Sequence, residues 1–457
     1  MPAEAPPALT YYAATADRSP PRPPLSGRVD AEVCIVGAGF AGLATALGLI
    51  ERGVRDVLLL EAEHVGFGAS GRNGGFVFGG YSLDCADLLD QQGPERARAM
   101  YGLTQDSLHL IRRRIATHGI NCDKVEGGAL LANWFDDDAL LRRQQALMAE
   151  HFDADWQWVD RDEMAQHVRT RRYTAGLLEP GGFHFHPLKY AQGLARAIEA
   201  GGGRVFEGSP VRSLQALPAA TAPGRGAATT QGDQRGPDTP AGTRIGSSGY
   251  RIRTAAGEVH ARHLVVTAGG YLRQLLPALE RAMLPIATYV MATEPLGERL
   301  REFIPGQAAV YDTRFAFDYY RPLPDTRILW GGRISILQRS PEAIRRLLTA
   351  DLLKVYPGLA GTRIDFAWGG LMSYARHKMP QIGRLPDGTW HALGFGGHGV
   401  APTTVAGELL ADALVGGKPV PPGFGDYGLP RVWGPAGQLA AQATYSWAEL
   451  RDWWRDR

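Results

Sequence analysis

The hydrophobic pattern is clearest near the start of the chain. An almost uniformly apolar run, EVCIV, is followed by a helical pattern over residues 40–52 and by a second apolar run, DVLLL. Leu43, Leu47 and Ile50 recur at offsets of four and seven, which places them on one helical face. Uniformly apolar strands are typical of parallel sheets that are covered on both faces. The pattern therefore predicts a strand, a helix and a second parallel strand.

Three glycines with GxGxxG spacing, Gly37, Gly39 and Gly42, lie between the first strand and the helix. Such glycines allow a tight turn, the close approach of a pyrophosphate, and close packing of helix on strand. Glu61 ends the second strand about 20 residues further on, where a carboxylate accepts hydrogen bonds from ribose hydroxyls. Because a chain with 58 glycines among 457 residues produces this spacing roughly once by chance, the flanking strands and the acid carry the prediction of a dinucleotide site.

A polar, glycine-rich loop, EAEHVGFGASGRNGGF, begins at Glu61. Its backbone N–H groups and the Arg72 guanidinium can lie along an extended anionic cofactor. The loop resembles the flavin-binding start of the D-amino-acid oxidase superfamily, and GASGRNGG is similar to the gamma-glutamylputrescine oxidase branch. The resemblance implies FAD as the cofactor. It also implies an α/β fold, with a Rossmann-like FAD-binding domain and an interleaved α+β substrate domain built on a mainly antiparallel sheet.

A second glycine turn near the C-terminus carries the same resemblance. The segment WHALGFGGHGVAPTTVAGELLADAL predicts a strand, a turn at residues 394–399 and a helix. In the superfamily this turn and the helix start meet the isoalloxazine, where a helix N-terminus stabilises the negative charge of reduced flavin. The resemblance places His398 near the ring, and it implies further cofactor contacts near Val211 and at residues 267–269.

The motifs and the resemblance together predict one set of FAD-binding residues. They are Gly37, Ala38, Gly39, Phe40, Ala41, Gly42, Glu61, Ala62, Gly68, Ala69, Ser70, Arg72, Asn73, Gly74, Gly75, Val211, Ala268, Gly269, Gly396, Gly397, His398, Gly399 and Val400. The covalent attachments found in some relatives lack support, because no cysteine lies in the C-terminal half and no histidine lies in GASGRNGG. We therefore expect FAD to be bound noncovalently.

Residues 285–333 carry strand patterns with tight turns, which predict the antiparallel sheet of the substrate domain. Tyr319, Tyr320 and Arg321 lie on one predicted strand, so alternate side chains face opposite sides. Either Tyr319 and Arg321 share the face towards the flavin or Tyr320 has it alone, and the pattern does not choose between the two. With His398, these residues are the candidates for catalysis.

Two departures from the superfamily bear on the substrate. Monomeric sarcosine oxidases read GHGFK at the second turn, with lysine where this chain has Ala401, and the Arg-Pro usual in D-amino-acid enzymes is replaced by GGLMSYARHKMPQIG. Both cations hold an α-carboxylate in those relatives. Because a buried carboxylate without its cation is costly, their absence favours an amine whose carboxylate, if it has one, is remote.

We therefore expect FAD-dependent oxidation of a C–N bond in a primary or secondary amine of the gamma-glutamylputrescine type. A hydride would leave for flavin N5, the imine would hydrolyse, and O₂ would reoxidise the flavin to give H₂O₂. One alternative is a dehydrogenase of N-methyl or D-amino acids that passes electrons to a quinone or carrier. Another is a flavin-bearing binding protein without turnover.

Composition indicates an arm, an insertion and a tail, and the resemblance implies that the two domains between them are discontinuous. We expect an extended, proline-rich arm over residues 1–30 and a disordered insertion over 215–248, where large apolar side chains are almost absent. A Trp-rich tail covers 426–457 and is expected to dock on its own domain or on an oligomer partner, with a membrane surface as the alternative. The FAD-binding domain is expected to comprise 31–83, 160–214, 249–275 and 365–425, and the substrate domain 84–159 and 276–364.

Composition excludes several other functions. A net charge of +2 gives no electrostatic reason to expect nucleic acid, and no apolar run reaches the ~18 residues of a membrane span. His184 and His186 lack a third ligand at suitable spacing, so no metal is predicted. Three cysteines without a pairing pattern suit a reducing compartment, and no secretory signal is visible. We expect a cytoplasmic protein whose partners are the amine and O₂, with an oligomer possible.

Overall fold

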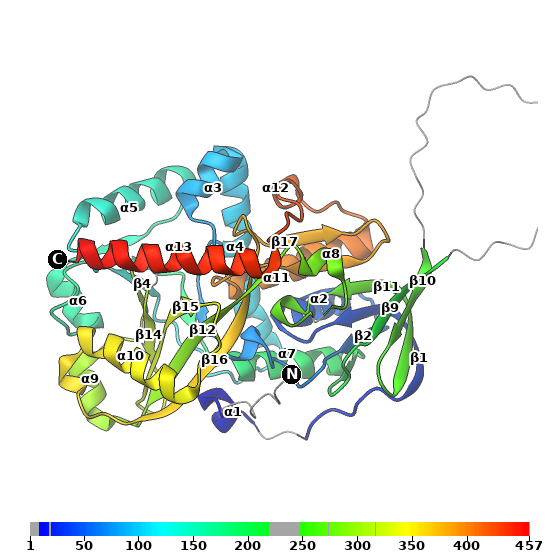
Figure 1. The fold of residues 1–457 in the computed structure, drawn as a ribbon, viewed down its shortest axis with the longest axis horizontal. Helices are drawn as coiled ribbons and strands as arrows, with labels where there is room; N and C mark the ends of the chain where they lie inside the picture. Colours follow the sequence, from blue (N-terminus) through cyan, green and yellow to red (C-terminus); the bar gives the residue numbers. More distant parts are fainter. Residues whose placement is uncertain (1–8, 18–19, 219–246, 273, 316, 457) are drawn as a thin grey trace, which may run out of the picture.

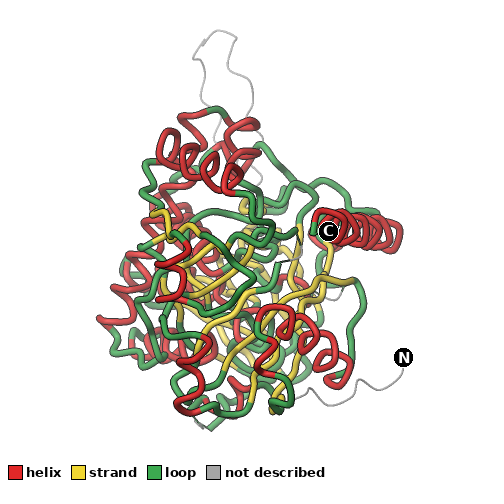
Figure 2. Tube along the Cα trace, turned by 90° about the vertical axis from the view of Figure 1, so that its left-hand side faces the viewer, coloured by secondary structure: helices red, strands yellow, loops and turns green. Residues whose placement is uncertain are grey.

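The computed structural model describes residues 9–17, 20–218, 247–272, 274–315 and 317–456. Two eight-stranded sheets form the body of the molecule, and the chain passes between them several times (Figure 1). A short third sheet pairs β3 (Phe76–Val77) with β7 (Phe183–His184). Figure 2 shows the same layers from the side, with helices around the strands.

The first sheet has a parallel core, as the uniformly apolar strands predicted. β1 (Gly27–Val36) lies between β2 (Val57–Leu60) and β11 (Gly257–Val266). β8 (Arg204–Phe206) and β18 (Trp390–Leu393) extend it in parallel, and β17 (Gln381–Arg384) is antiparallel to β18. The helix after the glycine turn, α2 (Phe40–Glu51), packs between α7 (Pro187–Ala200) and α11 (Val400–Gly416).

A hairpin extends this sheet away from the rest of the molecule. β9 (Ser213–Pro218) pairs with β10 (Ser247–Arg253), which in turn pairs with β11. Disorder was expected over residues 215–248, but both ends of that range belong to strands. Residues 219–246 lie outside the described part of the chain.

The second sheet has the order β16-β12-β15-β14-β13-β4-β6-β5. Every neighbouring pair is antiparallel except β13 with β4. Its strands are β4 (Ala129–Ala132), β5 (Gln157–Val159), β6 (Gly176–Glu179), β12 (Leu284–Thr293), β13 (Ala309–Asp312), β14 (Tyr319–Pro322), β15 (Ile328–Ser335) and β16 (Ile364–Tyr374). The predicted α/β fold with a mainly antiparallel second sheet is therefore confirmed.

Two strands of the second sheet lie in ranges that were predicted for the FAD-binding domain. β6 and most of β16 fall in ranges expected to belong to the FAD-binding domain, but both pair within the second sheet. A strand pattern shows which residues are extended, whereas sheet membership depends on partners far away in the sequence. The domain boundaries otherwise stay a prediction.

The remaining helices lie around the two sheets. α3 (Cys85–Gln92), α4 (Pro94–Thr117) and α5 (Asp138–Phe152) pack against one another, and α10 (Pro341–Val355) packs on β12 and β16. Shorter helices are α6 (Arg161–His167), α8 (Pro277–Glu280), α9 (Leu300–Phe303) and α12 (Pro422–Gly425). Of the helices in the described residues, none has the length and apolar character needed to cross a bilayer.

The N-terminal arm is not extended throughout, which corrects the expectation from its prolines. Tyr11–Thr15 form α1, capped by the Thr10 side chain. Tyr11 and Tyr12 are buried, and the Tyr12 hydroxyl donates a hydrogen bond of 2.8 Å to the Asn73 carbonyl. Tyr12 thus anchors the arm to the predicted cofactor loop.

The Trp-rich tail forms α13 (Gly434–Arg455), which crosses the front of the molecule in Figure 1. Polar contacts hold it to the second sheet: Asp452 accepts from the Phe315 N–H at 2.8 Å, and Glu449 pairs with Arg333 at 3.2 Å. The tail therefore docks on its own chain. Its outer side leaves Trp447 and Trp454 exposed.

The two histidines considered as metal ligands have structural contacts instead. The His184 Nε2 donates to the Gln307 carbonyl at 3.0 Å, and the His186 Nδ1 accepts from the Lys189 N–H, which caps α7. In the described part of the chain, no cluster of three or more histidine, cysteine or acidic side chains could hold a metal ion. These contacts give both histidines a structural role, and His186 begins a helix.

We expect buried His391 on β18 to make folding less favourable in acid. Burial lowers its pKa from 6.5 to about 4, so between these values the unfolded chain takes up a proton that the folded chain excludes. Relative to His391→Asn, the wild type should lose up to about 1.4 kcal/mol of unfolding free energy per pH unit below 6.5. Urea unfolding of both proteins at several pH values between 7.5 and 5 measures this difference. A stability difference that does not change with pH would contradict it.

Candidate functional site

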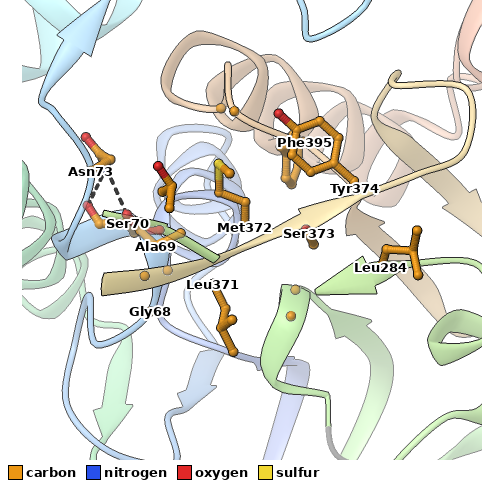
Figure 3. Close-up of a pocket in the computed structure, with 18 of the residues that line it drawn as sticks. Gly68, Ala69, Ser70, Asn73, Leu284, Leu371, Met372, Ser373, Tyr374 and Phe395 are labelled. Carbon is orange, nitrogen blue, oxygen red and sulfur yellow. Dashed lines mark hydrogen bonds between the residues drawn. The ribbon is translucent and has the colours of Figure 1, made fainter. Parts of the chain in front are cut away.

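A cavity of about 1430 Å³ opens where the parallel strands of the first sheet end. Residues at or just beyond the carboxyl ends of β1, β2, β11 and β18 line it, which is where α/β sheets bind ligands. β16 supplies a second wall: Figure 3 shows Leu371, Met372 and Tyr374 on this strand, together with Gly68 and Ser70 of the loop. Both sheets therefore build the cavity, and α13 closes part of it.

The first glycine turn is fixed against the strands on both of its sides. The Gly37 N–H donates to the Leu60 carbonyl at 2.8 Å, and the Gly37 carbonyl accepts from the Thr267 hydroxyl at 3.1 Å. Gly37 has a φ of +105°, which favours glycine. A Cβ on Gly42 would overlap the Gly37 carbonyl oxygen. The turn thus needs glycine at its start and again where the helix crosses it.

Glu61 lies beside this turn, as the spacing predicted. Its carboxylate accepts from the Ala38 N–H at 2.8 Å and from the Glu63 N–H at 3.1 Å. Burial raises the pKa of Glu61, and these two N–H groups oppose the rise. The carboxyl lines the cavity together with Val211, so it holds the turn and also faces the space where a ribose would lie.

The glycine-rich loop folds back on the first turn. The Ser70 hydroxyl accepts from the Phe40 N–H at 2.8 Å, at the start of α2. The Asn73 side chain donates to the carbonyls of Ala69 and Ser70, shown dashed in Figure 3, and accepts from the Gly75 N–H at 2.7 Å. These bonds fix the loop as a wall of the cavity.

The second glycine turn lies in the same cavity, and it holds His398 in one tautomer. The His398 backbone N–H donates to the Ser82 hydroxyl at 3.1 Å, and its Nε2 lies 3.3 Å from the Phe78 carbonyl. Because a carbonyl oxygen can only accept, Nε2 carries the hydrogen and Nδ1 keeps a lone pair. Burial lowers the pKa of His398 to about 4, so the imidazole is neutral at pH 7.

The predicted cofactor residues gather around this cavity. All of them line it except Ala38, Gly42 and Gly75. Those three lie behind the wall, where they hold Glu61, the Gly37 turn and Asn73 in the ways described above. Contact of each residue with FAD stays a prediction.

The structure shows which face of β14 meets the cavity. Tyr319 lines the cavity. Tyr320 points the other way and is fully buried, stacked on Trp330 with ring centroids 4.4 Å apart and hydrogen-bonded to the Tyr356 hydroxyl. Tyr320 was a candidate for catalysis, but it cannot touch a molecule in this cavity and is a core residue.

Arg321 shares the face of Tyr319 but does not reach the cavity. Its guanidinium is buried and donates to the carbonyls of Gly74 at 2.7 Å and Phe185 at 2.9 Å. It also contacts the Tyr12 hydroxyl and the His184 Nδ1. Burial, aided by this cation, lowers the pKa of His184 to about 3. Arg321 therefore positions the cofactor loop and the N-terminal arm.

Sequence reasoning missed two parts of the cavity wall. One is the end of β16, residues 371–374, and the other is a group of aromatic side chains. The alternation in FVF, directly after the loop, was a usable signal, because Phe76 and Phe78 must share one face of an extended segment. Tyr311 and Phe317 carried no such local signal.

The cavity wall suits a long anionic cofactor. At three places where the backbone lines it, a Cβ would be crowded: it would overlap the Tyr319 ring at Gly74 and the Tyr374 hydroxyl at Gly397, and it would press on the Tyr271 ring at Gly68. Glycine at these points keeps the backbone close to whatever fills the cavity. The helix α2 starts at the first turn and α11 starts at the second, so two positive helix ends meet the same space. FAD, with a pyrophosphate and a ring system, fits both features.

We expect Gly42→Ala to weaken the binding of FAD and Gly102→Ala to leave it unchanged. The added methyl at Gly42 meets a backbone carbonyl that cannot move aside, whereas at Gly102 on α4 a Cβ meets no atom within 4 Å. FAD affinity should fall at least about tenfold for Gly42→Ala, the equivalent of 1.4 kcal/mol. Both variants would be titrated with FAD after removal of the cofactor, and equal affinities would contradict the role of the turn.

Comparison with known proteins agrees with this geometry. The family model DAO, described as FAD dependent oxidoreductase, matches residues 32–413. The chain is 36% identical over 409 residues to the gamma-glutamylputrescine oxidoreductase of Escherichia coli K12, covering 89% of each protein. It is 29% identical over 415 residues to the probable oxidoreductase OrdL of Haemophilus influenzae, covering 89% of this chain and 88% of that one.

Solved structures share the fold at lower identity. Glycine oxidase from Geobacillus kaustophilus superimposes with a TM-score of 0.67 at 20% identity, over 88% of this chain and 99% of that one. L-proline dehydrogenase from P. horikoshii gives a TM-score of 0.66 at 16% identity, over 92% and 99%. With the family match, the cavity and its two glycine turns lead to one conclusion. The chain belongs to the FAD dependent oxidoreductase (DAO) family and is an FAD-dependent enzyme.

Proposed function

We propose that the protein oxidises a C–N bond in a primary or secondary amine of the gamma-glutamylputrescine type. One observation carries this proposal: aromatic side chains, among them Phe78, Tyr311 and Tyr374, line the cavity wall that also holds the neutral His398 imidazole. Such a wall suits an uncharged alkyl chain next to the reacting nitrogen and offers no partner to an α-carboxylate. The gamma-glutamylputrescine oxidoreductase relative supports the same substrate class.

Two of the cations that line the cavity are already paired with carboxylates of the second sheet and its neighbouring helix. Arg314 lines the cavity and pairs with Asp312 at 2.6 Å and Asp318 at 2.5 Å. Arg333 also lines it, and its two contacts with Asp351 are both 2.7 Å. A substrate carboxylate would have to compete with these buried carboxylates. This favours a substrate whose reacting carbon carries no carboxylate.

The two glycine turns and the loop would hold the cofactor across the cavity. Glu61 would accept from the ribose, and the N–H groups at the start of α2 would face the pyrophosphate. When bound, FAD supplies an acceptor for the hydride equivalent that leaves the carbon next to the substrate nitrogen. The N-terminus of α11, at Val400, favours negative charge at the ring end. The loop GASGRNGG has no histidine and the C-terminal half has no cysteine to form a covalent link, so we propose noncovalent binding.

His398 would hold the substrate amine in the neutral form that the reaction requires, by accepting a hydrogen bond from its nitrogen. An alkylammonium ion cannot release a hydride, so the substrate must first lose a proton from nitrogen. The neutral His398 has its Nδ1 lone pair available, because Nε2 donates to the Phe78 carbonyl. The imine product would then be hydrolysed by water, and O₂ would be the final electron acceptor. The three free cysteines suit a cytoplasmic location.

Anaerobic mixing of the purified holoenzyme with amines tests the function. Gamma-glutamylputrescine should bleach the flavin absorbance much faster than glycine, sarcosine or D-alanine, because only the latter three carry a carboxylate on a carbon bonded to the reacting nitrogen. Failure of every amine to bleach the flavin would contradict the proposal, and so would bleaching by the amino acids alone.

The same samples identify the electron acceptor. Admission of air should restore the flavin absorbance and produce hydrogen peroxide in proportion to the amine consumed. Slow recovery in air, with rapid recovery in the presence of a quinone or dye, would show a dehydrogenase instead.

A further inference from the structure

Five aromatic side chains close a ring on the cavity wall, and we call this group the aromatic cage. Its members are Phe76, Phe78, Tyr311, Phe317 and Tyr319, all of which line the cavity. Around the ring, successive centroids lie 6.4, 5.2, 5.9, 6.3 and 5.5 Å apart, from Phe76 through Phe78, Tyr311, Phe317 and Tyr319 back to Phe76. Each member thus contacts two others.

The register of the strands brings these side chains together. β13 and β14 are antiparallel with Tyr311 directly opposite Tyr319, so both rings point to the same face. Phe76 and Phe78 are two residues apart in an extended segment and face that same space. The cage therefore forms at the one place where residues 76–78 meet β13 and β14.

The aromatic cage differs from ordinary core packing. On the opposite face of β14, Tyr320, Trp330 and Tyr356 form a cluster in which each residue is at most 1% exposed. No cage member is buried to that extent, and Phe317 is 38% exposed. Aromatic side chains that fill a core lose their accessible surface. The cage keeps surface inside a cavity, which is what a binding site requires.

The ring planes provide the walls of a cation site. Four of the five neighbouring pairs are edge-to-face or nearly so, with interplanar angles of 81°, 68°, 62° and 63°. Rings arranged in this way surround a space rather than form one stack. Aromatic faces attract cations through the ring quadrupole, most strongly in a dry site.

A buried carboxyl group behind the cage adds to this preference. Glu179 accepts from the Gly79 N–H at 3.0 Å and from the Gln105 side chain at 3.1 Å, and Gly79 directly follows Phe78. Its second oxygen, Oε2, is buried and has no hydrogen-bond partner among the described residues. When ionised, it would favour positive charge on the other side of Phe78 and Tyr311.

We propose that the aromatic cage binds the alkylammonium group of the substrate and holds the amine beside His398. The Phe78 and His398 ring centroids lie 4.1 Å apart, so the cage adjoins the group that would accept a hydrogen bond from the amine. This inference rests on amine oxidation as the function of the cavity. The preference of the enzyme for amines over amino acids would then come from the five cage residues, whose rings attract a cation and offer no partner to a carboxylate.

A quaternary ammonium ion tests the cage without turnover. Choline has no lone pair on nitrogen and so cannot form an imine. The alcohol 3,3-dimethyl-1-butanol, called dimethylbutanol below, has the same shape but carries a neutral carbon in place of the charged nitrogen. Titration of the oxidised holoenzyme, followed by the change in flavin absorbance, should show choline binding at least about tenfold more tightly than dimethylbutanol. Equal binding, or no binding of choline, would overturn the inference.

Three substitutions and a control locate the site. Tyr311→Leu and Phe317→Leu should each raise the Kd of choline about five- to tenfold, whereas Tyr311→Phe keeps the ring and should leave it near the wild-type value. Phe366→Leu makes the same kind of change on β16, where Phe366 packs on Tyr11 outside the cavity. It should not alter choline binding. Loss of choline binding in Phe366→Leu would overturn the assignment. Unchanged choline binding in Tyr311→Leu and Phe317→Leu would overturn it as well.

Failure of the cage and failure of the proposed function give different results. Oxidation of amines by an enzyme that binds choline and dimethylbutanol equally would overturn the cage and leave the function. Tight choline binding that depends on Tyr311 and Phe317, in an enzyme that no amine reduces, would support the cage as a cation site and overturn amine oxidation.

Discussion

The whole site depends on the position of one peptide turn between two neighbouring strands. Gly37 is bonded to Leu60 on one side and to Thr267 on the other, so the ends of β1, β2 and β11 cannot shift relative to one another. Gly42 then lets α2 pass against the same turn without a side chain between them. These contacts set the direction of α2 and the position of Glu61. Everything that faces the pyrophosphate end of the cavity follows from them.

The other end of the cavity depends on β16, the strand of the second sheet whose end contacts the second glycine turn. β16 pairs with β12 along its length, and its last residue, Tyr374, bridges to Phe395 just before the glycine turn. Ser82 donates to the Phe395 carbonyl and accepts from the His398 N–H. The segment after the cofactor loop and the C-terminal turn are thereby fixed to each other, which places Phe78 of the aromatic cage beside His398.

The features that the sequence predicted well are local. The strand, turn and helix around Gly37 depend on residues within about 30 positions of one another, and so does the glycine-rich loop. The resemblance supplied the second turn, which no local rule would have joined to the first. Tyr319 and Tyr320 show where local reasoning stops: alternation puts them on opposite faces, but only the pairing of β14 with β13 and β15 decides which face meets the cavity.

The features that the sequence could not predict depend on partners far apart in the chain. Arg321 is buried because Tyr12, Gly74 and Phe185 converge on it from three segments. The arm at Tyr11 and Tyr12 looked extended from its prolines, yet both rings are buried against the second sheet. Tyr311 and Phe317 became visible as part of a site only when strand register placed them beside Phe78.

A crystal structure of the protein isolated with its own FAD would test the central claim most directly. The account predicts one FAD molecule in the cavity, with its pyrophosphate at the Gly37 turn and its ring system at the second glycine turn, beside His398. A flavin ring that lies away from the second glycine turn, or an FAD bound elsewhere on the molecule, would contradict it.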